Sequence, residues 1–518
     1  METRTLGRKT AVVSAAAGAS RVLGFARDVL LAALLGSGAA ADAFVVAFRI
    51  PSLVRRVLGE GALNAGVVPV LSRLGHEEGD AAQLRAAGEI LTTAALALLI
   101  LVAIGQVFAP WLVLALAGGF ADDAERLTLA SLYTRLMLPT IGAAVLAGLA
   151  GAILNAGGRV LGAALAPLVV NLALVAVLVV LAFSDLAPQA MGTVLAAAVT
   201  IAGVAQLAIL VPPLMRGPAA PRLSRPRLSP ALRRVLALGL PGMAVAAAAQ
   251  IGIVVATQVA SHEPSAVARL YYADRLFSLP LGFVAAAAGT VFLPELARLL
   301  RSGDTAAVVE AQNRAMEWAL LLAVPAALAL AVLAEPIVSV LFERAAFSRQ
   351  DTVVTASCLA ALAFGLPAAA VARIQSQAFF AREDVRRPLA AALGGVVATL
   401  AVAILLEPRF GAVGVAWAVT AGSWVGAVLL AAVAVRRGVH AGWARLGARV
   451  ARIVAAALVM AAVVAALAAL AAPVLDPSAP TLLRAGVLAA LCATGLAVFG
   501  LAALLAGAVD RGDLQRLR

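Results

Sequence analysis

The sequence predicts an all-α polytopic membrane protein with fourteen transmembrane helices, and its composition carries that prediction. Of the 518 residues, 63% are hydrophobic and only 13% are charged, and the mean hydropathy is +1.02. Soluble globular chains are about half apolar and about a quarter charged. Aromatic residues amount to 5%, and long runs of Ala, Leu and Val favour helices over the alternating strands of a barrel. This composition excludes a soluble enzyme, a disordered chain and a disulfide-rich secreted module.

The chain contains fourteen apolar runs that reach about the 20 residues needed to cross a bilayer. We expect spans near 11–35, 40–70, 88–117, 127–154, 158–183, 190–215, 232–260, 265–297, 311–334, 352–381, 388–406, 411–435, 446–474 and 480–508. Arginine-rich loops alternate with short acidic loops between these spans. Because Lys/Arg-rich loops face the cytoplasm, both termini are expected to be cytoplasmic.

One basic linker suggests how the spans are grouped. Segment 216–234 has six arginines, four prolines and no acidic residue. It separates an N-lobe of six spans (1–215) from a C-lobe of six spans (235–440), and 441–518 adds two helices and a tail. AFRIPSL at 47–53 resembles ADRLFSL at 273–279, as a six-helix duplication requires. Such a repeat keeps its orientation, so we expect two lobes related by a pseudo-two-fold axis along the membrane normal.

Charged residues cluster inside four of the expected spans, although each costs about 2.5–3.5 kcal/mol at the bilayer centre. In spans 1, 2, 8 and 10 we single out seven arginines and four acidic residues: Arg21, Arg27, Arg49, Arg55, Arg56, Arg275 and Arg373, with Asp28, Asp42, Glu60 and Asp274. The acids cannot neutralise all of the arginines. The sequence therefore predicts a hydrated, cationic cavity that attracts an anion, and guanidinium groups suit phosphate or pyrophosphate oxygens.

The spacing of these charges indicates which of them share a helix face. Asp42, Arg49 and Arg56 recur every seven residues, and Arg56 and Glu60 are four apart, so these four side chains are expected on one face of span 2. We expect Arg21, Arg27, Arg55 and Arg275 to contact the substrate, and we add Arg49, Arg56 and Arg373 as further candidates. Asp42 and Glu60 are also candidates for the substrate site. Because Asp28, Glu60 and Asp274 each have a basic neighbour, we favour ion pairs that lock helices together for these three, and we expect Asp28 and Asp274 to act as ion-pair or gating residues.

Several functional motifs are absent from the sequence. It has no GxxxxGK[ST] phosphate loop, no HExxH or other metal-ligand cluster, and no basic-aromatic strip for nucleic acid. We therefore expect a transporter without cofactors, driven by an ion gradient or the membrane potential, and not an enzyme.

The charged segments resemble the MurJ/MviN family of lipid II flippases, in the multidrug/oligosaccharidyl-lipid/polysaccharide exporter superfamily. The motifs that carry the resemblance are SRVLGFARD (20–28), ADAF (41–44), LVRR (53–56), GAILNA (151–156) and YYADRLFSLPLG (271–282). The resemblance extends over essentially the whole chain. It implies a two-lobe fold with a cationic central cavity and a groove for a polyprenyl tail along spans 13 and 14.

The resemblance also assigns roles to individual residues. It implies required arginines at Arg21, Arg27, Arg55 and Arg275, an acidic position at Asp42, and a cavity position at Glu60 in the EGA motif. Some family members have a sodium site in the second lobe. Its ligands are unassigned here, because spans 7, 11 and 12 contain almost no carboxylates.

The resulting prediction is a lipid II flippase of the bacterial cytoplasmic (inner) membrane. It would move undecaprenyl-pyrophosphate-linked disaccharide-pentapeptide to the outer leaflet by alternating access, in contact with membrane lipids and without nucleic acid. The resemblance leaves open contacts with other cell-wall synthesis proteins. The alternatives are an exporter of another lipid-linked oligosaccharide or of drugs, a membrane-embedded polyprenyl-glycosyltransferase, and a scaffold that transports nothing. A drug exporter would need cavity acids, and a transferase would need an acidic metal-binding motif.

Overall fold

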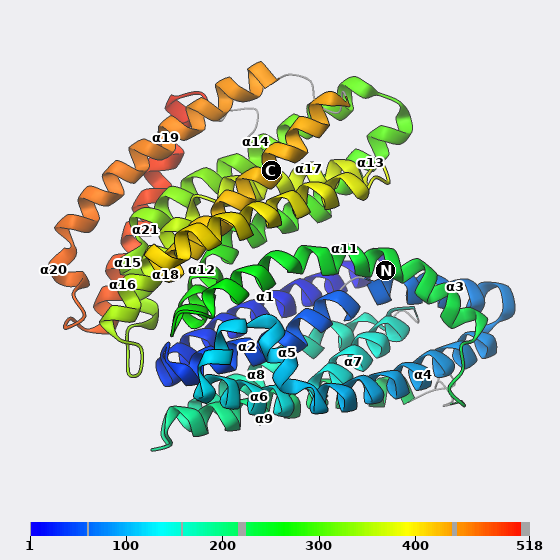
Figure 1. The fold of residues 1–518 in the computed structure, drawn as a ribbon. Helices are drawn as coiled ribbons and strands as arrows, with labels where there is room; N and C mark the ends of the chain where they lie inside the picture. Colours follow the sequence, from blue (N-terminus) through cyan, green and yellow to red (C-terminus); the bar gives the residue numbers. More distant parts are fainter. Residues whose placement is uncertain (1, 60–61, 157–158, 216–223, 438–442, 509–518) are drawn as a thin grey trace. The chain divides into compact units, whose positions relative to one another are not determined.

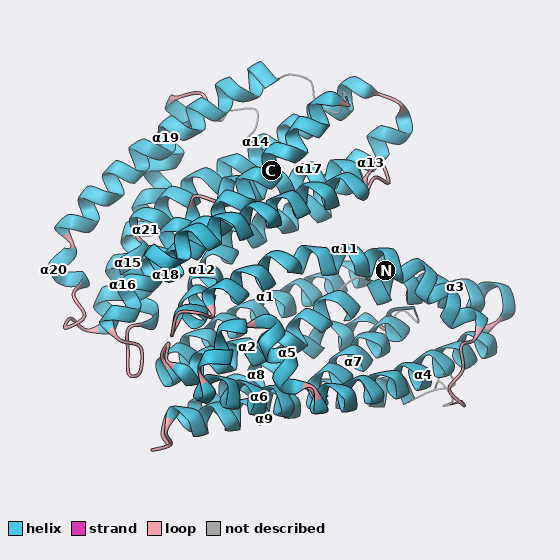
Figure 2. Cartoon of the chain, in the orientation of Figure 1, coloured by secondary structure: helices cyan, strands magenta, loops and turns pink. Residues whose placement is uncertain are grey.

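The computed structural model describes residues 2–59, 62–156, 159–215, 224–437 and 443–508, which form helices joined by short turns, with no strand among them (Figures 1 and 2). The chain divides into two compact units, Met1–Gln250 and Ile251–Arg518. The division falls inside one continuous helix, α11 (Pro230–Ala260), beyond the end of the basic segment 216–234. Each unit is described by itself below.

The first unit contains ten α-helices, a π-helical turn and a 3₁₀ turn before α11. In chain order they are α1 (Glu2–Leu35), α2 (Ala39–Val54), the π-helix η1 (Arg55–Gly59), α3 (Ala62–Glu78), α4 (Asp80–Val107), α5 (Ala109–Leu116), the 3₁₀ helix η2 (Gly118–Asp122), α6 (Ala124–Met137), α7 (Pro139–Ala156), α8 (Val160–Leu181), α9 (Pro188–Ala208) and α10 (Val211–Met215). Helix α1 packs along α8, and α2 packs along α6.

The second unit has a similar order of elements. It consists of the end of α11, α12 (Ala266–Ala287), the π-helix η3 (Ala288–Phe292), α13 (Leu293–Ser302), α14 (Thr305–Val332), α15 (Ala334–Phe342), α16 (Arg349–Ala363), α17 (Leu366–Phe380), α18 (Arg386–Arg436), α19 (Trp443–Leu470), α20 (Ala472–Leu475) and α21 (Thr481–Leu505). Helix α19 packs against α14 and α21, so the last two long helices belong to this unit.

Helix boundaries recur between the two units. Helices α4 and α14 are both 28 residues long, and a single residue, Phe108 or Leu333, separates each of them from the short helix that follows, α5 or α15. Both units also contain a π-helical turn between two α-helices, η1 in one and η3 in the other. The local match between 47–53 and 273–279 is therefore part of a longer correspondence between helix positions.

The longest helix, α18, contains one break. Its 51 residues would extend about 75 Å at 1.5 Å per residue, far more than the roughly 30 Å bilayer core. Gly411 interrupts it with φ 54° and ψ −134°. Glu263, in the turn after α11, accepts a hydrogen bond from the backbone N–H of Ala412 at 2.6 Å. The break agrees with the expected boundary between spans 388–406 and 411–435.

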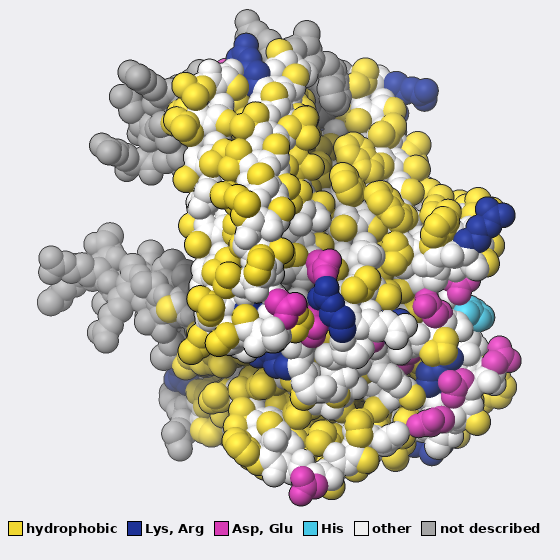
Figure 3. Space-filling model, turned by 90° about the vertical axis from the view of Figure 1, so that its left-hand side faces the viewer, with side chains coloured by type: hydrophobic (Ala, Val, Ile, Leu, Met, Phe, Trp, Pro, Cys, Tyr) yellow, Lys and Arg dark blue, Asp and Glu magenta, His cyan; other side chains and the backbone are white. Residues whose placement is uncertain are grey.

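Hydrophobic side chains cover much of the exterior and also fill the interior. Figure 3 shows hydrophobic residues over wide areas of one face, with charged residues in scattered groups. Leu99 of α4 and Leu405 of α18 are 67% and 71% exposed, as expected of helices that face lipid. Inside the first unit, a buried cluster joins α3, α4, α7 and α11 through residues such as Val67, Ile90 and Val235.

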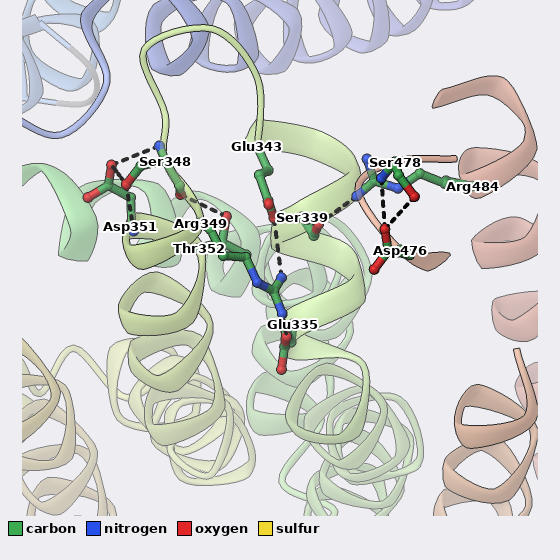
Figure 4. A network of polar contacts seen from close by, with 10 residues as sticks. All are labelled: Glu335, Ser339, Glu343, Ser348, Arg349, Asp351, Thr352, Asp476, Ser478 and Arg484. Carbon is green, nitrogen blue, oxygen red and sulfur yellow. Dashed lines mark hydrogen bonds and ion pairs between the residues drawn. The ribbon is translucent and has the colours of Figure 1, made fainter. Parts of the chain in front are cut away.

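A polar network fixes α21 to the α15–α16 turn in the second unit (Figure 4). Arg484 of α21 is buried and donates to the Ser339 hydroxyl at 2.5 Å, and Ser339 donates to Glu343 at 2.6 Å. Arg349 pairs with both Glu335 and Glu343. Charged and hydroxyl groups therefore connect three helices, α15, α16 and α21, where hydrophobic packing alone would leave their ends free to slide.

Candidate functional site

Arg27 lies near the end of α1 and is held by groups from three helices. Its Nε and Nη2 donate to the carboxylate of Asp28 at 3.0 and 2.8 Å, and its Nη1 donates to Oδ1 of Asn171 on α8 at 3.2 Å. The guanidinium also lies over the Phe48 ring of α2, 5.3 Å from its centroid. The side chain is 15% exposed and that of Asp28 is 4% exposed. Arg27 is therefore a fixed, partly accessible cation.

Arg21 occupies the same helix two turns earlier and has a different environment. It is exposed and has no hydrogen bond or ion pair with any residue of the described ranges. Its exposed guanidinium is therefore available to bind an anion. The two arginines of α1 thus differ: Arg27 is oriented by hydrogen bonds, and Arg21 is exposed.

The row of charges expected on span 2 is divided by a change in helix type. Helix α2 ends at Val54, and the π-helix η1 places Arg55 and Arg56 in a wider turn. π-helical turns are uncommon and frequently occur at functional sites. Arg56 donates to Oε1 of Gln250 on α11 at 3.1 Å. Arg49 and Arg55 are half-buried, while Glu60, the expected partner of Arg56, lies outside the described residues.

Asp42, at the start of α2, is completely buried in an ion pair. Its Oδ2 lies 3.6 Å from Nη1 of Arg126 on α6, and Arg126 is 4% exposed. Arg126 also binds Asp123 at 2.6 Å and lies over the Phe120 ring, 4.7 Å from its centroid. We call this ion pair between Asp42 on α2 and Arg126 on α6 the first clamp. Asp42 could contact substrate only if this clamp opened.

In the second unit, Arg275 is oriented by an aromatic ring. On α12 its Nη2 donates to the Tyr271 hydroxyl at 2.9 Å, and the guanidinium lies 4.4 Å from the centroid of that ring. The ion pair expected of Asp274 is not present among the described residues: Asp274 is half-buried and Arg275 turns one helical turn back to Tyr271. Arg373, on α17, is exposed and has no partner in the described part of this unit.

Three polar residues near these groups were not predicted from the sequence. Arg126 lies one residue before the expected span 127–154, and its place three residues after the helix-capping Asp123 was the available signal. Asn171 is the one polar side chain of α8, and a single amide in an apolar span usually hydrogen-bonds another helix. The sequence did not single out Gln250 in the same way, because α11 contains other polar residues.

The described residues contain no group of three His, Cys, Asp or Glu side chains able to hold a metal ion. The chemistry available at the site is electrostatic: oriented guanidinium groups that can bind anionic oxygens.

Comparisons with known proteins agree with this chemistry. The family model described as "Lipid II flippase MurJ" matches residues 31–479. The chain belongs to the MurJ family. It is 38% identical over 516 residues to a probable lipid II flippase MurJ of Rhizobium meliloti, covering 99% of this chain and 96% of that protein. It is 32% identical over 438 residues to the lipid II flippase MurJ of Burkholderia cenocepacia, covering 82% and 84%.

Solved structures show the same fold as this MurJ family member. A lipid II flippase MurJ in an inward closed conformation matches with a TM-score of 0.77 at 22% identity, covering 95% of this chain and 98% of that one. An inward-facing multidrug resistance MATE family transporter of the MOP superfamily matches with a TM-score of 0.67 at 16% identity, covering 81% and 94%. The polytopic, all-helical membrane architecture predicted from composition is confirmed, as is the family resemblance.

Proposed function

We propose that this protein is a lipid II flippase, moving an undecaprenyl-pyrophosphate-linked peptidoglycan precursor from the inner to the outer leaflet of the cytoplasmic membrane. The observation that carries the proposal is the MurJ family match over residues 31–479. The oriented arginines support it, because the guanidinium fork matches the oxygens of a phosphate or pyrophosphate group. A transporter needs no catalytic group for this step.

The proposed topology has fourteen spans with both termini in the cytoplasm. Eight described helices are long and apolar enough to cross a membrane, or nine with the α16–α17 pair, which is bent by 43°. Counting α18 as two helices on either side of Gly411 gives ten. The remaining four are α1, α2 to α3, α11, and α12 to α13. Three of these carry arginines within the proposed spans, which makes them less hydrophobic than the other ten.

Two lobes related by a pseudo-two-fold axis along the membrane normal remain part of this proposal. The recurrence of helix boundaries between the units supports it, because a duplicated six-helix unit would keep its orientation. In this scheme residues 441–518 supply the two further helices, which would lie along the polyprenyl tail.

The driving force we propose is the membrane potential or an ion gradient. A potential that is negative inside favours outward movement of an anion by about 2.3 kcal/mol per charge per 100 mV. The arginines would release the pyrophosphate outside and return without it.

The test is translocation of purified lipid II in proteoliposomes, compared between wild type and Arg27→Ala or Arg275→Ala. We expect each variant to lose most of its activity. Arg301→Gln is the matched control, because this exposed arginine of α13 is outside the proposed site. Equal rates in wild type and both site variants would contradict the role of the arginines. A wild type that moves a different lipid-linked sugar, but not lipid II, would favour the related exporter.

A further inference from the structure

The amide of Asn171 connects two parts of α1 to α8. Its Oδ1 accepts from Nη1 of Arg27 at 3.2 Å, and its Nδ2 donates to the carbonyl and hydroxyl oxygens of Ser20 at 2.9 and 3.0 Å. Ser20, Gly24 and Arg27 lie at i, i+4 and i+7, on one face of α1. A Cβ on Gly24 would lie 3.5 Å from Nδ2 of Asn171, so the amide lies over this glycine, between the two residues that it binds.

This amide uses its hydrogen-bonding groups in one orientation only. Exchanging its oxygen and nitrogen would place the NH₂ group against the Arg27 guanidinium and the amide oxygen against the Ser20 carbonyl oxygen, and both contacts are unfavourable. Ser20 therefore sets the direction of the amide, and the amide sets the position of Nη1. Every other side chain of α8 is apolar or glycine, so no other group of that helix can do this.

An amide also holds a guanidinium without neutralising it. A second carboxylate at position 171 would fix Arg27 equally well, but it would give the arginine two anionic partners and weaken its attraction for a phosphate. Asp28 already supplies one carboxylate, 2.8 Å away. A neutral acceptor from α8 fixes the geometry and leaves the electrostatic balance unchanged.

We propose that Asn171 is a positioning residue for substrate binding, acting through Arg27. This inference rests on the proposed function, since it assigns to Asn171 the orientation of an arginine that binds the anionic headgroup. Asn171 itself does not contact substrate. Its effect should therefore disappear when Arg27 is absent.

The experiment is a double-mutant cycle with equilibrium binding of fluorescently labelled lipid II and thermal stability in detergent as readouts. Asn171→Leu keeps a similar volume in an apolar helix but removes the acceptor. We expect roughly five- to tenfold weaker binding from this variant with an unchanged or higher Tm, and less than about a twofold further loss when it is added to Arg27→Ala. Gln106→Leu is the control: Gln106 also joins two helices, through the Arg135 carbonyl at 2.9 Å, but contacts no site arginine.

Equal losses from Asn171→Leu in both backgrounds would overturn the inference, and so would a loss that parallels a fall in Tm, because both indicate helix packing. Unchanged binding in Asn171→Leu, when Arg27→Ala binds weakly, would also overturn it. A measurement without substrate separates this inference from the proposed function: the rate at which phenylglyoxal modifies Arg27. That rate should rise in Asn171→Leu and stay at the wild-type value in Gln106→Leu, even if wild type fails to bind lipid II. An unchanged rate in Asn171→Leu would contradict the positioning role.

Discussion

Each unit contains one buried ion pair between equivalent helices, and the two pairs have opposite polarity. In the first unit the acid, Asp42, is on α2 and the arginine, Arg126, is on α6. In the second unit the arginine, Arg269, is on α12 and the acid, Asp351, is on α16, 2.9 Å away. Arg126 and Asp351 occupy the same place in their helices, each being the third residue of α6 or α16. The position of the pair is therefore retained between the units, although its polarity is not.

The exchange of charges indicates what the two pairs do. A bridge between two helices is equally strong whichever helix carries the acid, so a clamp tolerates the exchange. A substrate site does not, because its ligand has a fixed sign. Both clamps also adjoin a helix start: Asp123 caps α6 beside Arg126, and Asp351 forms a capping box with Ser348 at α16. The exchanged pairs fit a structural role, in contrast to the arginines of α1 and η1.

The largest expected effect is loss of the first clamp. Arg126→Met leaves the carboxylate of Asp42, which is 0% exposed, buried without this partner. Breaking a buried pair in this way typically costs about 3–5 kcal/mol. We expect a large fall in the melting temperature in detergent, measured by size-exclusion chromatography of heated samples.

The matched variant for this prediction neutralises both partners. Arg126→Met with Asp42→Asn removes the isolated charge and should recover much of the lost stability. If the double variant is no more stable than Arg126→Met alone, Asp42 and Arg126 do not form the energetic unit described here.

The second clamp is the ion pair between Arg269 on α12 and Asp351 on α16. Its loss should lower the melting temperature less, because its side chains are less buried, at 12% exposed for Arg269 and 10% for Asp351. Arg269→Met should cost roughly 2–3 kcal/mol, below the range for a fully buried pair. Asp351→Asn should lose the pair and weaken the α16 cap, for which about 1 kcal/mol is typical. The same heated-sample assay measures both. A larger loss from Arg269→Met than from Arg126→Met would reverse the ranking and contradict burial as its cause.

The sequence predicted the membrane fold and the clustered charges, but not which charges form clamps. Composition determined the fold class because 63% hydrophobic residues cannot be buried in a soluble core. Spacing selected Asp42, Arg49 and Arg56, yet it could not anticipate the π-helical turn at Arg55 or the partner that Asp42 finds on α6. Spacing alone also did not indicate that Arg275, the neighbour of Asp274 in sequence, donates its hydrogen bond to Tyr271. Pairing between helices depends on packing that a local pattern does not contain.

The units also differ where two long helices meet. In the first unit α8 and α9 are joined by residues 182–187, whereas in the second Gly411 alone breaks α18. A Cβ at Gly411 would overlap the Glu263 carboxylate, and its φ of 54° disfavours other residues. Gly411→Ala should therefore cost about 1–3 kcal/mol. Asp185→Ala, in the corresponding loop, is the control and should leave the melting temperature unchanged. Equal melting temperatures for Gly411→Ala and wild type would show that the break does not require glycine.

The smallest expected effect is a pH dependence that arises at Asp123, the helix cap beside the Asp42–Arg126 pair. Hydrogen bonds from the Arg126 backbone N–H and guanidinium hold the pKa of Asp123 below its usual value, against a smaller opposing effect of burial. The pKa of Asp123 is therefore lower in the folded state than in the unfolded state, where it is near 4. The charged Asp123 carboxylate stabilises the fold above that unfolded-state pKa, and this stabilisation is lost as the pH falls through the folded-state pKa.

Asp123→Asn tests this dependence directly. It keeps an oxygen that can cap α6 but removes the titrating group, so its melting temperature should change less than that of wild type between pH 6 and about pH 3.5. At pH 6 the variant should be slightly less stable, because the charged contact with Arg126 is weakened. Parallel curves for the two proteins would exclude Asp123 as the source. Ser348, which occupies the equivalent capping position at α16, does not itself titrate, so Ser348→Ala should leave the pH-dependent contribution of Asp123 in place, whereas Asp123→Asn removes it. This final difference would separate the two clamps by their caps, even if the buried pairs prove equally strong.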